Sequence, residues 1–261
     1  MRKGNHTKMR VCVITVAGIA SRFSQSVGYN VLKCIYYKQS PKETLIYRMI
    51  RSVEDFDRCV IVGGFEFEAL KAYVEQELWQ WKEKIILVHN PYYREYGSGY
   101  SLYYGLKETI HTEFDEVLFA EGDLFVDKSS LRRVTDSKKS VLTITNTPVL
   151  AEKSVAVYCD SNWKLRYIFD TNHGILKIDE PFKAIYNSGQ IWKFSDASHF
   201  RESFKSLSAK DWQGTNLNFI QKYFGTLDVS AYEIIDFKTW INCNTVQDFE
   251  DSLALSFGEK L

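Results

Sequence analysis

The sequence predicts an α/β fold in which a mostly parallel sheet lies between two layers of helices. Apolar, β-branched runs alternate with segments of helical periodicity through the first half of the chain, and this alternation builds parallel sheets that are covered on both faces. The chain has 261 residues, of which 45% are hydrophobic, so it can bury a large core. We therefore expect a three-layer α/β/α, Rossmann-like arrangement.

The first half of the chain contains the repeated strand–helix units. Residues 10–18, RVCVITVAG, are an apolar run that stops at a glycine, which predicts a buried strand followed by a tight turn. Residues 40–53 carry the start signals of a helix. Ser40 can cap it, Pro41 suits its first turn, and Glu43 completes a capping box. Similar patterns predict strands at 58–64, 84–90 and 115–126, and helices at 66–81 and 99–110.

The second half changes character, because its apolar runs are those of antiparallel strands and hairpins. The expected sheet is therefore mixed, although mostly parallel. No linker or low-complexity tract separates the halves, so we expect a single domain over 1–261 with an acceptor-binding lobe at roughly 140–240. The predicted elements of this half are strands at 140–149, 154–170, 184–195 and 234–245, and helices at 211–225 and 246–258.

Charge and cysteine content exclude several classes of protein. The formal net charge is +0, from 33 basic and 33 acidic residues, so we expect no nucleic-acid partner, which would require a basic face. The five cysteines are scattered, without a C-x-x-C pair, which argues against a disulfide framework or zinc site and for a reducing compartment. No apolar run approaches the roughly 18 residues of a membrane span.

The start of the chain has a second interpretation. MRKGNHTKMR is basic, VCVITVAGIA is apolar, and the small residues that follow fit the cleavage site of a secretion signal. The apolar run is short for a signal, however, and free cysteines do not suit export. We therefore expect a cytoplasmic protein whose first residues precede a strand.

Ligands of open α/β sheets bind beyond the carboxyl ends of the strands, and one candidate loop follows the first strand. In AGIASR, at 17–22, Gly18 permits a tight turn, small residues let backbone N–H groups approach an anion, and Arg22 offers a planar fork of donors. The loop lacks the G-K-[ST] of a Walker loop and two glycines of the dinucleotide fingerprint. An ordinary small-residue turn is the alternative.

Two further charged residues follow predicted strands or loops. Asp123, in FAEGDLFVD, is well placed for a divalent cation, with a Gly-Asp turn as the alternative. We expect its neighbours Glu121 and Asp127 to be exposed or to serve in turns. Lys33, in YNVLKCIYY, could reach phosphates bound by the glycine loop, or it could be a surface lysine.

The glycine loop, Lys33 and Asp123 follow one another along the chain. This order resembles that of the nucleotidyltransferases of the sugar-nucleotide and cytidylyltransferase type. That family begins with a strand and L-A-A-G-x-G-S-R, where this chain has VAGIASRF, and its later motifs correspond to LKCI, NPYYREYGSGYSLYYGL, EGDLFVD, YNSGQIWKF and WINCNTVQDFEDSLAL. The resemblance spans nearly the whole chain. It is greatest to small cytidylyltransferases that activate phosphocholine or related phosphates and phosphonates, and it implies a glycosyltransferase-A-like nucleotidyltransferase fold.

The resemblance also implies an activity. CMP would pass from CTP to a small phosphorylated or phosphonate acceptor, with release of pyrophosphate, in reactions such as those of cell-surface polysaccharide synthesis. Arg22 and Lys33 would neutralise the phosphates, Ser101 would lie near the base, and Asp123 and Asn244 would hold Mg²⁺. The nucleotide would be cradled by the backbone of Ala17, Gly18, Ile19, Ala20 and Ser21. The resemblance leaves open whether the protein is a homodimer.

This chain departs from the family pattern at four positions. Ala20 replaces a glycine, which matters only if the position needs positive φ, and Leu32 replaces the proline before the lysine. Asn242 and Asn244 replace an acidic pair, and their uncharged carbonyls should lower metal affinity. Asn244 could act as a neutral ligand, another acid such as Asp236 could be recruited, or catalysis could be lost.

The acceptor is less defined than the nucleotide. Tyr186, Trp192 and Trp212, with Trp240, lie in the second half, where aromatic faces could surround a quaternary ammonium such as choline; core packing is the alternative. Aminoethylphosphonate, glutamine phosphate and sugar phosphates are other acceptors. The alternative functions are a non-catalytic nucleotide-binding or regulatory homologue, a sugar-1-phosphate nucleotidyltransferase, and a glycosyltransferase, for which the expected D-x-D is missing.

Overall fold

The computed structural model describes residues 9–151, 154–169 and 175–258. The strands in these ranges are β1 (Arg10–Thr15), β2 (Arg58–Gly63), β3 (Ile85–His89), β4 (Glu116–Glu121), β5 (Leu124–Val126), β6 (Ser140–Thr145), β7 (Ala156–Asp160), β8 (Leu165–Tyr167), β9 (Phe182–Phe194), β10 (Tyr232–Phe237) and β11 (Trp240–Asn242). The helices are α1 (Ser21–Val27), α2 (Leu45–Ser52), α3 (Phe67–Glu77), α4 (Ser98–Ile110), α5 (Lys128–Asp136), α6 (Ala197–Ser206), α7 (Ala209–Gln213), α8 (Leu217–Thr226) and α9 (Val246–Gly258).

A nine-stranded mixed sheet forms the middle layer, and its main path runs in the order β10-β6-β9-β4-β1-β2-β3. The pairs β1–β2, β1–β4, β2–β3 and β6–β10 are parallel. The long strand β9 is antiparallel to both β4 and β6, and its first half pairs with β7, which continues to β8. The predicted α/β fold with a mostly parallel mixed sheet is therefore confirmed.

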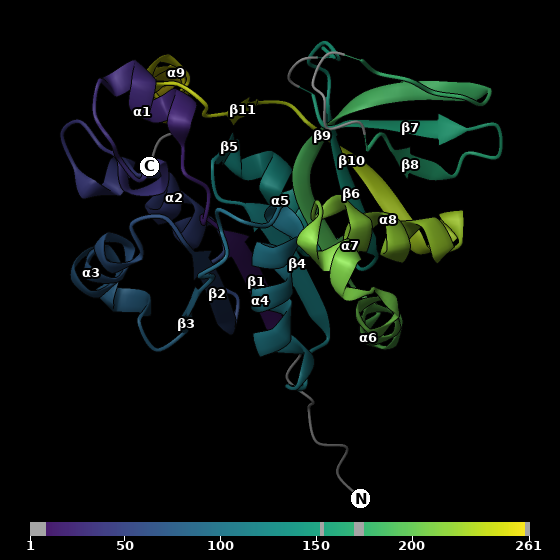
Figure 1. Cartoon of the computed structure of the whole chain (residues 1–261), viewed down its shortest axis with the longest axis horizontal. Helices are drawn as coiled ribbons and strands as arrows, with labels where there is room; N and C mark the ends of the chain where they lie inside the picture. The colour runs from purple at the N-terminus through teal and green to yellow at the C-terminus, as the bar shows by residue number, and fades with distance from the viewer. Residues whose placement is uncertain (1–8, 152–153, 170–174, 259–261) are drawn as a thin grey trace, which may run out of the picture.

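Helices cover both faces of this sheet (Figure 1). Successive residues of a strand point to opposite faces, and β1 shows the consequence. Val13 belongs to a buried cluster that includes residues of α4, α6 and α8. Ile14 belongs to a second cluster, on the other face, that includes residues of α2, α3 and α5. The near-continuous apolar run of β1 is thus explained by burial on both sides.

The run predicted as one strand at 115–126 is two strands in the structure. β4 ends at Glu121, and β5 begins at Leu124 and pairs with β11 in a separate two-stranded sheet. The turn between them requires Gly122, because a Cβ there would lie 2.3 Å from Val16 Cγ1. The chain therefore bends sharply at the end of β4, and Asp123 follows the bend.

The helix predicted over 40–53 begins later than expected. Ser40 caps only a short 3-10 turn, Pro41–Glu43. α2 starts at Leu45 because the Thr44 hydroxyl accepts a hydrogen bond from the backbone of Tyr47 at 3.2 Å. Two consecutive caps occur in this segment, and the second one starts the long helix.

The strand order reverses at β1, which has β2 on one side and β4 on the other. Such a reversal opens a crevice beyond the carboxyl ends of the two central strands. The loop after β1 and the turn after β4 both lie at this crevice. None of the helices in the described ranges has the length and apolar character needed to cross a membrane.

Candidate active site

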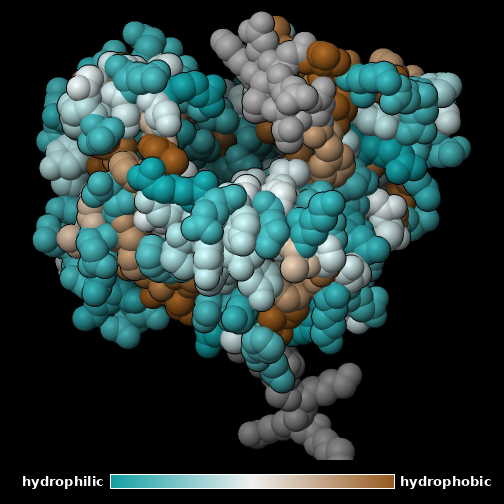
Figure 2. All heavy atoms as spheres, in the orientation of Figure 1, coloured by the Kyte–Doolittle hydropathy of each residue, from teal (hydrophilic) through white to brown (hydrophobic). Residues whose placement is uncertain are grey.

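A cavity of about 470 Å³ lies at the carboxyl ends of β1 and β4. Its walls come from the loop after β1, the segment around Lys33, the start of α4, the end of β4, and the residues that flank β7, β8 and α8. The space-filling view shows the molecule hollowed between its two upper lobes (Figure 2). Segments from both halves of the chain therefore meet at the place where the topology predicts a ligand.

The loop after β1 lines this cavity with Ala17, Gly18 and Ala20. Ala20 has φ 55° and ψ 38°, a left-handed conformation that costs a residue with a Cβ roughly 1–2 kcal/mol. This strain explains why the related motif has a glycine at the position. Ile19 and Ser21 are not among the lining residues, and Ile19 is 37% exposed. Their predicted nucleotide contacts remain predictions.

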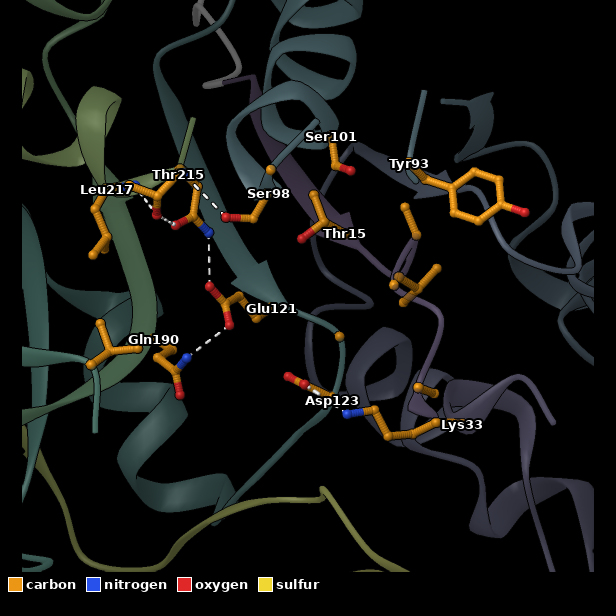
Figure 3. Close-up of a pocket in the computed structure, with 18 of the residues that line it drawn as sticks. Thr15, Lys33, Tyr93, Ser98, Ser101, Glu121, Asp123, Gln190, Thr215 and Leu217 are labelled. Atoms are coloured by element: carbon orange, nitrogen blue, oxygen red, sulfur yellow. Dashed lines mark hydrogen bonds and ion pairs between the residues drawn. The ribbon is translucent and has the colours of Figure 1, made fainter. Parts of the chain in front are cut away.

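Lys33 and Asp123 form an ion pair in the lining of the cavity (Figure 3). Lys33 Nζ lies 2.8 Å from Asp123 Oδ2. The other carboxylate oxygen of Asp123, Oδ1, is buried and has no hydrogen-bond partner among the described residues. The structure thus brings two of the predicted residues together, and it leaves one oxygen of Asp123 free to accept.

Glu121 also faces the cavity, so the prediction of an exposed or turn residue is wrong. Its Oε1 accepts from Asn216 Nδ2 at 2.7 Å, and its Oε2 accepts from Gln190 Nε2 at 2.8 Å. Figure 3 shows Glu121 between Gln190 and the segment that leads into α8. Burial and the nearby charge of Asp123 raise the pKa of Glu121 to about 7.

Gln190 is held in a strained backbone conformation beside Glu121. Its φ is 57°, and such a conformation in a residue other than glycine is often found at a functional site. Its backbone N–H donates to Ser188 Oγ at 3.2 Å, and its Oε1 accepts from Asn242 Nδ2 at 3.2 Å. The sequence contained a signal for Gln190, which follows the NSG motif directly; nothing local distinguished Asn216.

The start of α4 forms the opposite wall. Ser101 is buried and lines the cavity, and its expected place near the base stays a prediction. Its Oγ accepts from Asn90 Nδ2 at 3.0 Å, and Asn90 Oδ1 accepts from the backbone of Tyr92 at 3.0 Å. Because Asn90 supplies the donor in this bond, the Ser101 hydroxyl retains its own hydrogen to donate.

Arg22, Asn242 and Asn244 are not among the residues that line the cavity. Arg22 Nη2 donates to Asn244 Oδ1 at 2.9 Å. Asn242 Oδ1 is buried and has no partner within the described ranges. Asp236 is remote, because β6 and β9 separate its strand, β10, from β4, and it accepts instead from Asn146.

The tryptophans predicted to bind the acceptor lie in the core. Trp192 is fully buried and stacks on Phe119 with ring centroids 5.1 Å apart, so the prediction of acceptor binding is wrong for it. Trp212 is 5% exposed and packs among aromatic rings of α4, α6 and α8, which excludes it in the same way. Tyr186 packs at the edge of the core and does not line the cavity. Trp240 donates from Nε1 to the carbonyl of Gly189 at 2.9 Å.

The donor set near Asp123 suits a cation that arrives with a phosphate. In the described residues, no group of three or more His, Cys, Asp or Glu side chains is arranged to hold a metal ion. Mg²⁺ is commonly bound by one or two carboxylates together with substrate phosphates and waters. The free Oδ1 of Asp123 fits one such position.

Solved structures of other proteins share this architecture. The inositol-1-phosphate CTP transferase of T. maritima has 19% sequence identity and a TM-score of 0.65, over 94% of this chain and 95% of that chain. The CTP:phosphocholine cytidylyltransferase of Streptococcus pneumoniae has 17% identity and a TM-score of 0.63, over 95% of this chain and 99% of that chain. The chain thus has the nucleotidyltransferase fold, which confirms the fold expected from its motifs.

The family assignment is separate from the fold. The family described as a domain of unknown function (DUF6564) matches residues 29–255, and the chain belongs to it. No curated protein matches the chain.

Proposed function

We propose that this protein is a nucleotidyltransferase that transfers CMP from CTP to a small acceptor with a phosphate or phosphonate group. The observation that supports this most is that the loop after β1, Lys33 and Asp123 line one cavity at the strand-order reversal. The fold, shared with enzymes of this class, supports it as well.

In the proposed reaction, an acceptor oxygen attacks the α-phosphorus of CTP, and the bond from that phosphorus to pyrophosphate breaks. An acceptor phosphate is largely ionised near neutral pH, so no general base is needed. The chain's own contribution is to position the phosphates and to stabilise their charge. Lys33 would exchange part of its contact with Asp123 for the phosphate oxygens, and Arg22 would add donors from the rim.

Mg²⁺ is the proposed cofactor, and Asp123 is the residue proposed to hold it. Asn244 was the expected second ligand, but its Oδ1 accepts from Arg22. The Oδ1 of Asn242 has no such partner among the described residues, which favours Asn242 for this role. When bound, the cation would withdraw negative charge from the phosphate oxygens.

CTP is the proposed nucleotide because of Ser101 and of the two relatives. The Ser101 hydroxyl retains a hydrogen for a base acceptor, since Asn90 donates to its oxygen. The two solved structures described above are those of a CTP transferase and a CTP:phosphocholine cytidylyltransferase. A catalytically inactive nucleotide-binding homologue is the second candidate, and the neutral amides of Asn242 and Asn244 favour it.

A pyrophosphate-release assay tests the proposal. The four nucleoside triphosphates are each combined with a panel of phosphorylated and phosphonate acceptors, with Mg²⁺ and with Mn²⁺. We expect release with CTP, and loss of release in Asp123→Asn but not in the matched control Asp236→Asn. Silence across the whole panel, together with calorimetric CTP binding, would favour the inactive homologue instead.

A further inference from the structure

The strand β3 leaves one edge of the central sheet open. It ends the main path of the sheet, and among the described strands it pairs only with β2. The carbonyl of Lys84 and the N–H of Asn90, which flank β3, both bond backbone groups of β2 at 2.8 Å. Backbone groups of alternate residues bond the same neighbouring strand. Those of Ile85, Leu87 and His89 therefore point away from β2, toward the open edge.

Nothing in β3 prevents its pairing with a further strand. Edge strands are commonly protected by charged side chains, prolines or bulges. The sequence of β3, IILVH, has no proline, lysine, arginine or acid, its register with β2 is unbroken, and all its residues are at least partly exposed. β10, at the opposite end of the main path, carries Glu233 and Asp236. One end of the path thus has the usual protection, and the β3 end lacks it.

We propose that β3 pairs in antiparallel orientation with β3 of a second copy of this chain, so that the two sheets join across a two-fold axis. The outward groups are complementary under an axis at Leu87. The two Leu87 residues would exchange both N–H to carbonyl bonds, and the N–H of each His89 would donate to the carbonyl of Ile85 in the other copy. Lys84 would lie opposite Asn90, so no like charges would meet along the strands. The same surface serves both copies, as a two-fold dimer requires.

The helix α4 forms a flank of this edge. Gly105 of α4 faces β1 and β2, and Tyr103 faces α7. With 3.6 residues per turn, Tyr104 and Glu108 lie on the other flank of the helix, on the side of β3. Tyr104 is partly exposed and packs against the same buried cluster as two residues of β3. An aromatic side chain of this kind is typical of an interface.

The charges along this flank are complementary in a two-fold pair. Glu108 is exposed near the end of α4, and Arg94 is exposed in the segment before the helix. Neither has an ion-pair partner within the described ranges. Because α4 connects β3 to a strand of the same direction, it runs opposite to β3. The axis at Leu87 therefore brings the end of one α4 toward the beginning of the other, and Glu108 toward Arg94 of the second copy.

The test is sedimentation velocity of the whole chain at low ionic strength, from about 1 to about 100 μM protein. We expect the wild type to form a dimer. Glu108→Arg and Arg94→Glu should each weaken the dimer about tenfold or more, because each variant places like charges together at two symmetric contacts. The double variant should restore association, which a misfolded single variant could not explain. Glu202→Arg, at an exposed acid of α6, is the control and should associate as the wild type does.

Hydrogen exchange shows whether β3 is the strand that pairs. The amide hydrogens of Leu87 and His89 should exchange more slowly as the protein concentration rises, because the dimer gives them acceptors. A monomer over the whole concentration range would overturn the proposal. So would a dimer that the double variant does not restore, or exchange at Leu87 and His89 that is independent of concentration. None of these outcomes bears on the proposed transfer of CMP, which the pyrophosphate assay tests separately.

Discussion

Lys33 Nζ lies 2.8 Å from Asp123 Oδ2, although 90 positions separate the two residues. The pair joins the segment after α1 to the turn after β4, and it does so at the crevice where the strand order reverses. Both side chains are partly exposed, at 14% and 26%, so they are accessible to a ligand. This relationship underlies the proposed function.

Ala20→Gly should raise the free energy of unfolding. The left-handed φ of 55° at Ala20 costs roughly 1–2 kcal/mol, whereas the added freedom of glycine in the unfolded chain removes only about 0.4–1 kcal/mol of the gain. Urea denaturation should show a net increase of about 0 to 1.6 kcal/mol in the free energy of unfolding. Ala17→Gly, at a buried alanine without positive φ, should destabilise instead. An equal loss of the free energy of unfolding in Ala20→Gly and Ala17→Gly would show that the strain at Ala20 is absent.

Gly122→Ala should destabilise the fold and displace Asp123. A new Cβ would lie 2.3 Å from Val16 Cγ1 and 3.1 Å from the carbonyl of Thr15, and overpacking of this kind costs about 1–3 kcal/mol. The matched control is Gly18→Ala, where nothing lies within 4 Å of the added atom. Denaturation midpoints measure the stability of both variants. A Gly122→Ala variant as stable as Gly18→Ala would contradict the packing described for the turn.

Asp127 should make stability depend on pH in the acid range. Burial alone would raise the pKa of its carboxyl, but hydrogen bonds from Ser129, Ser130 and Thr239 outweigh burial and lower the pKa. Because the folded pKa lies below the unfolded value, the contribution is present above about pH 4 and is lost as pH falls through the folded pKa. Asp127→Asn should therefore lose less stability than the wild type on acidification.

Urea denaturation at a series of pH values between neutral and about 3 measures this difference. Asp136→Asn, an exposed acid at the other end of α5, is the control and should follow the wild type. Asp127 precedes α5, and its Oδ1 caps the helix by accepting from the backbone N–H of Ser130 at 2.8 Å. A wild-type curve that is no steeper than that of Asp127→Asn would contradict this capping role.

Lys193→Met should be strongly destabilising. Lys193 is fully buried, and its Nζ donates to the carbonyls of Thr135 and Ser137 at 3.0 and 2.6 Å and lies 3.3 Å from Glu116 Oε2. Removing one partner of such a buried pair costs about 3–5 kcal/mol. Lys183→Met, on the exposed end of the same strand, should stay within about 0.5 kcal/mol of the wild type. Similar denaturation midpoints for the two variants would contradict the buried network.

The sequence predicted the parts of the site that have local signals. The glycine turn after β1, Lys33 and Asp123 are each marked by their neighbours in the chain, and their order pointed to one site. The break between β4 and β5 was not predicted, because an apolar run carries no sign that one glycine within it must pack against Val16.

Contacts between residues far apart in the chain explain which parts of the site could not be predicted from the sequence. The local sequence predicts an exposed or turn residue at Glu121, because its partners, Gln190 and Asn216, follow it by 69 and 95 positions. The burial of Trp192 depends on β9 lying between β4 and β6, which no local pattern reveals. The start of α2 is ambiguous for a different, local reason. Ser40 and Thr44 can both cap a helix.

The central claim is that the loop after β1, Lys33 and Asp123 converge on the phosphates of a nucleotide. Its most direct test is calorimetric binding of CTP with Mg²⁺ to the wild type, to Lys33→Ala, and to the control Lys38→Ala, whose side chain pairs with Glu250 outside the cavity. The account predicts binding to the wild type and to Lys38→Ala, and binding at least about tenfold weaker to Lys33→Ala. Equal affinity of Lys33→Ala and the wild type would contradict it.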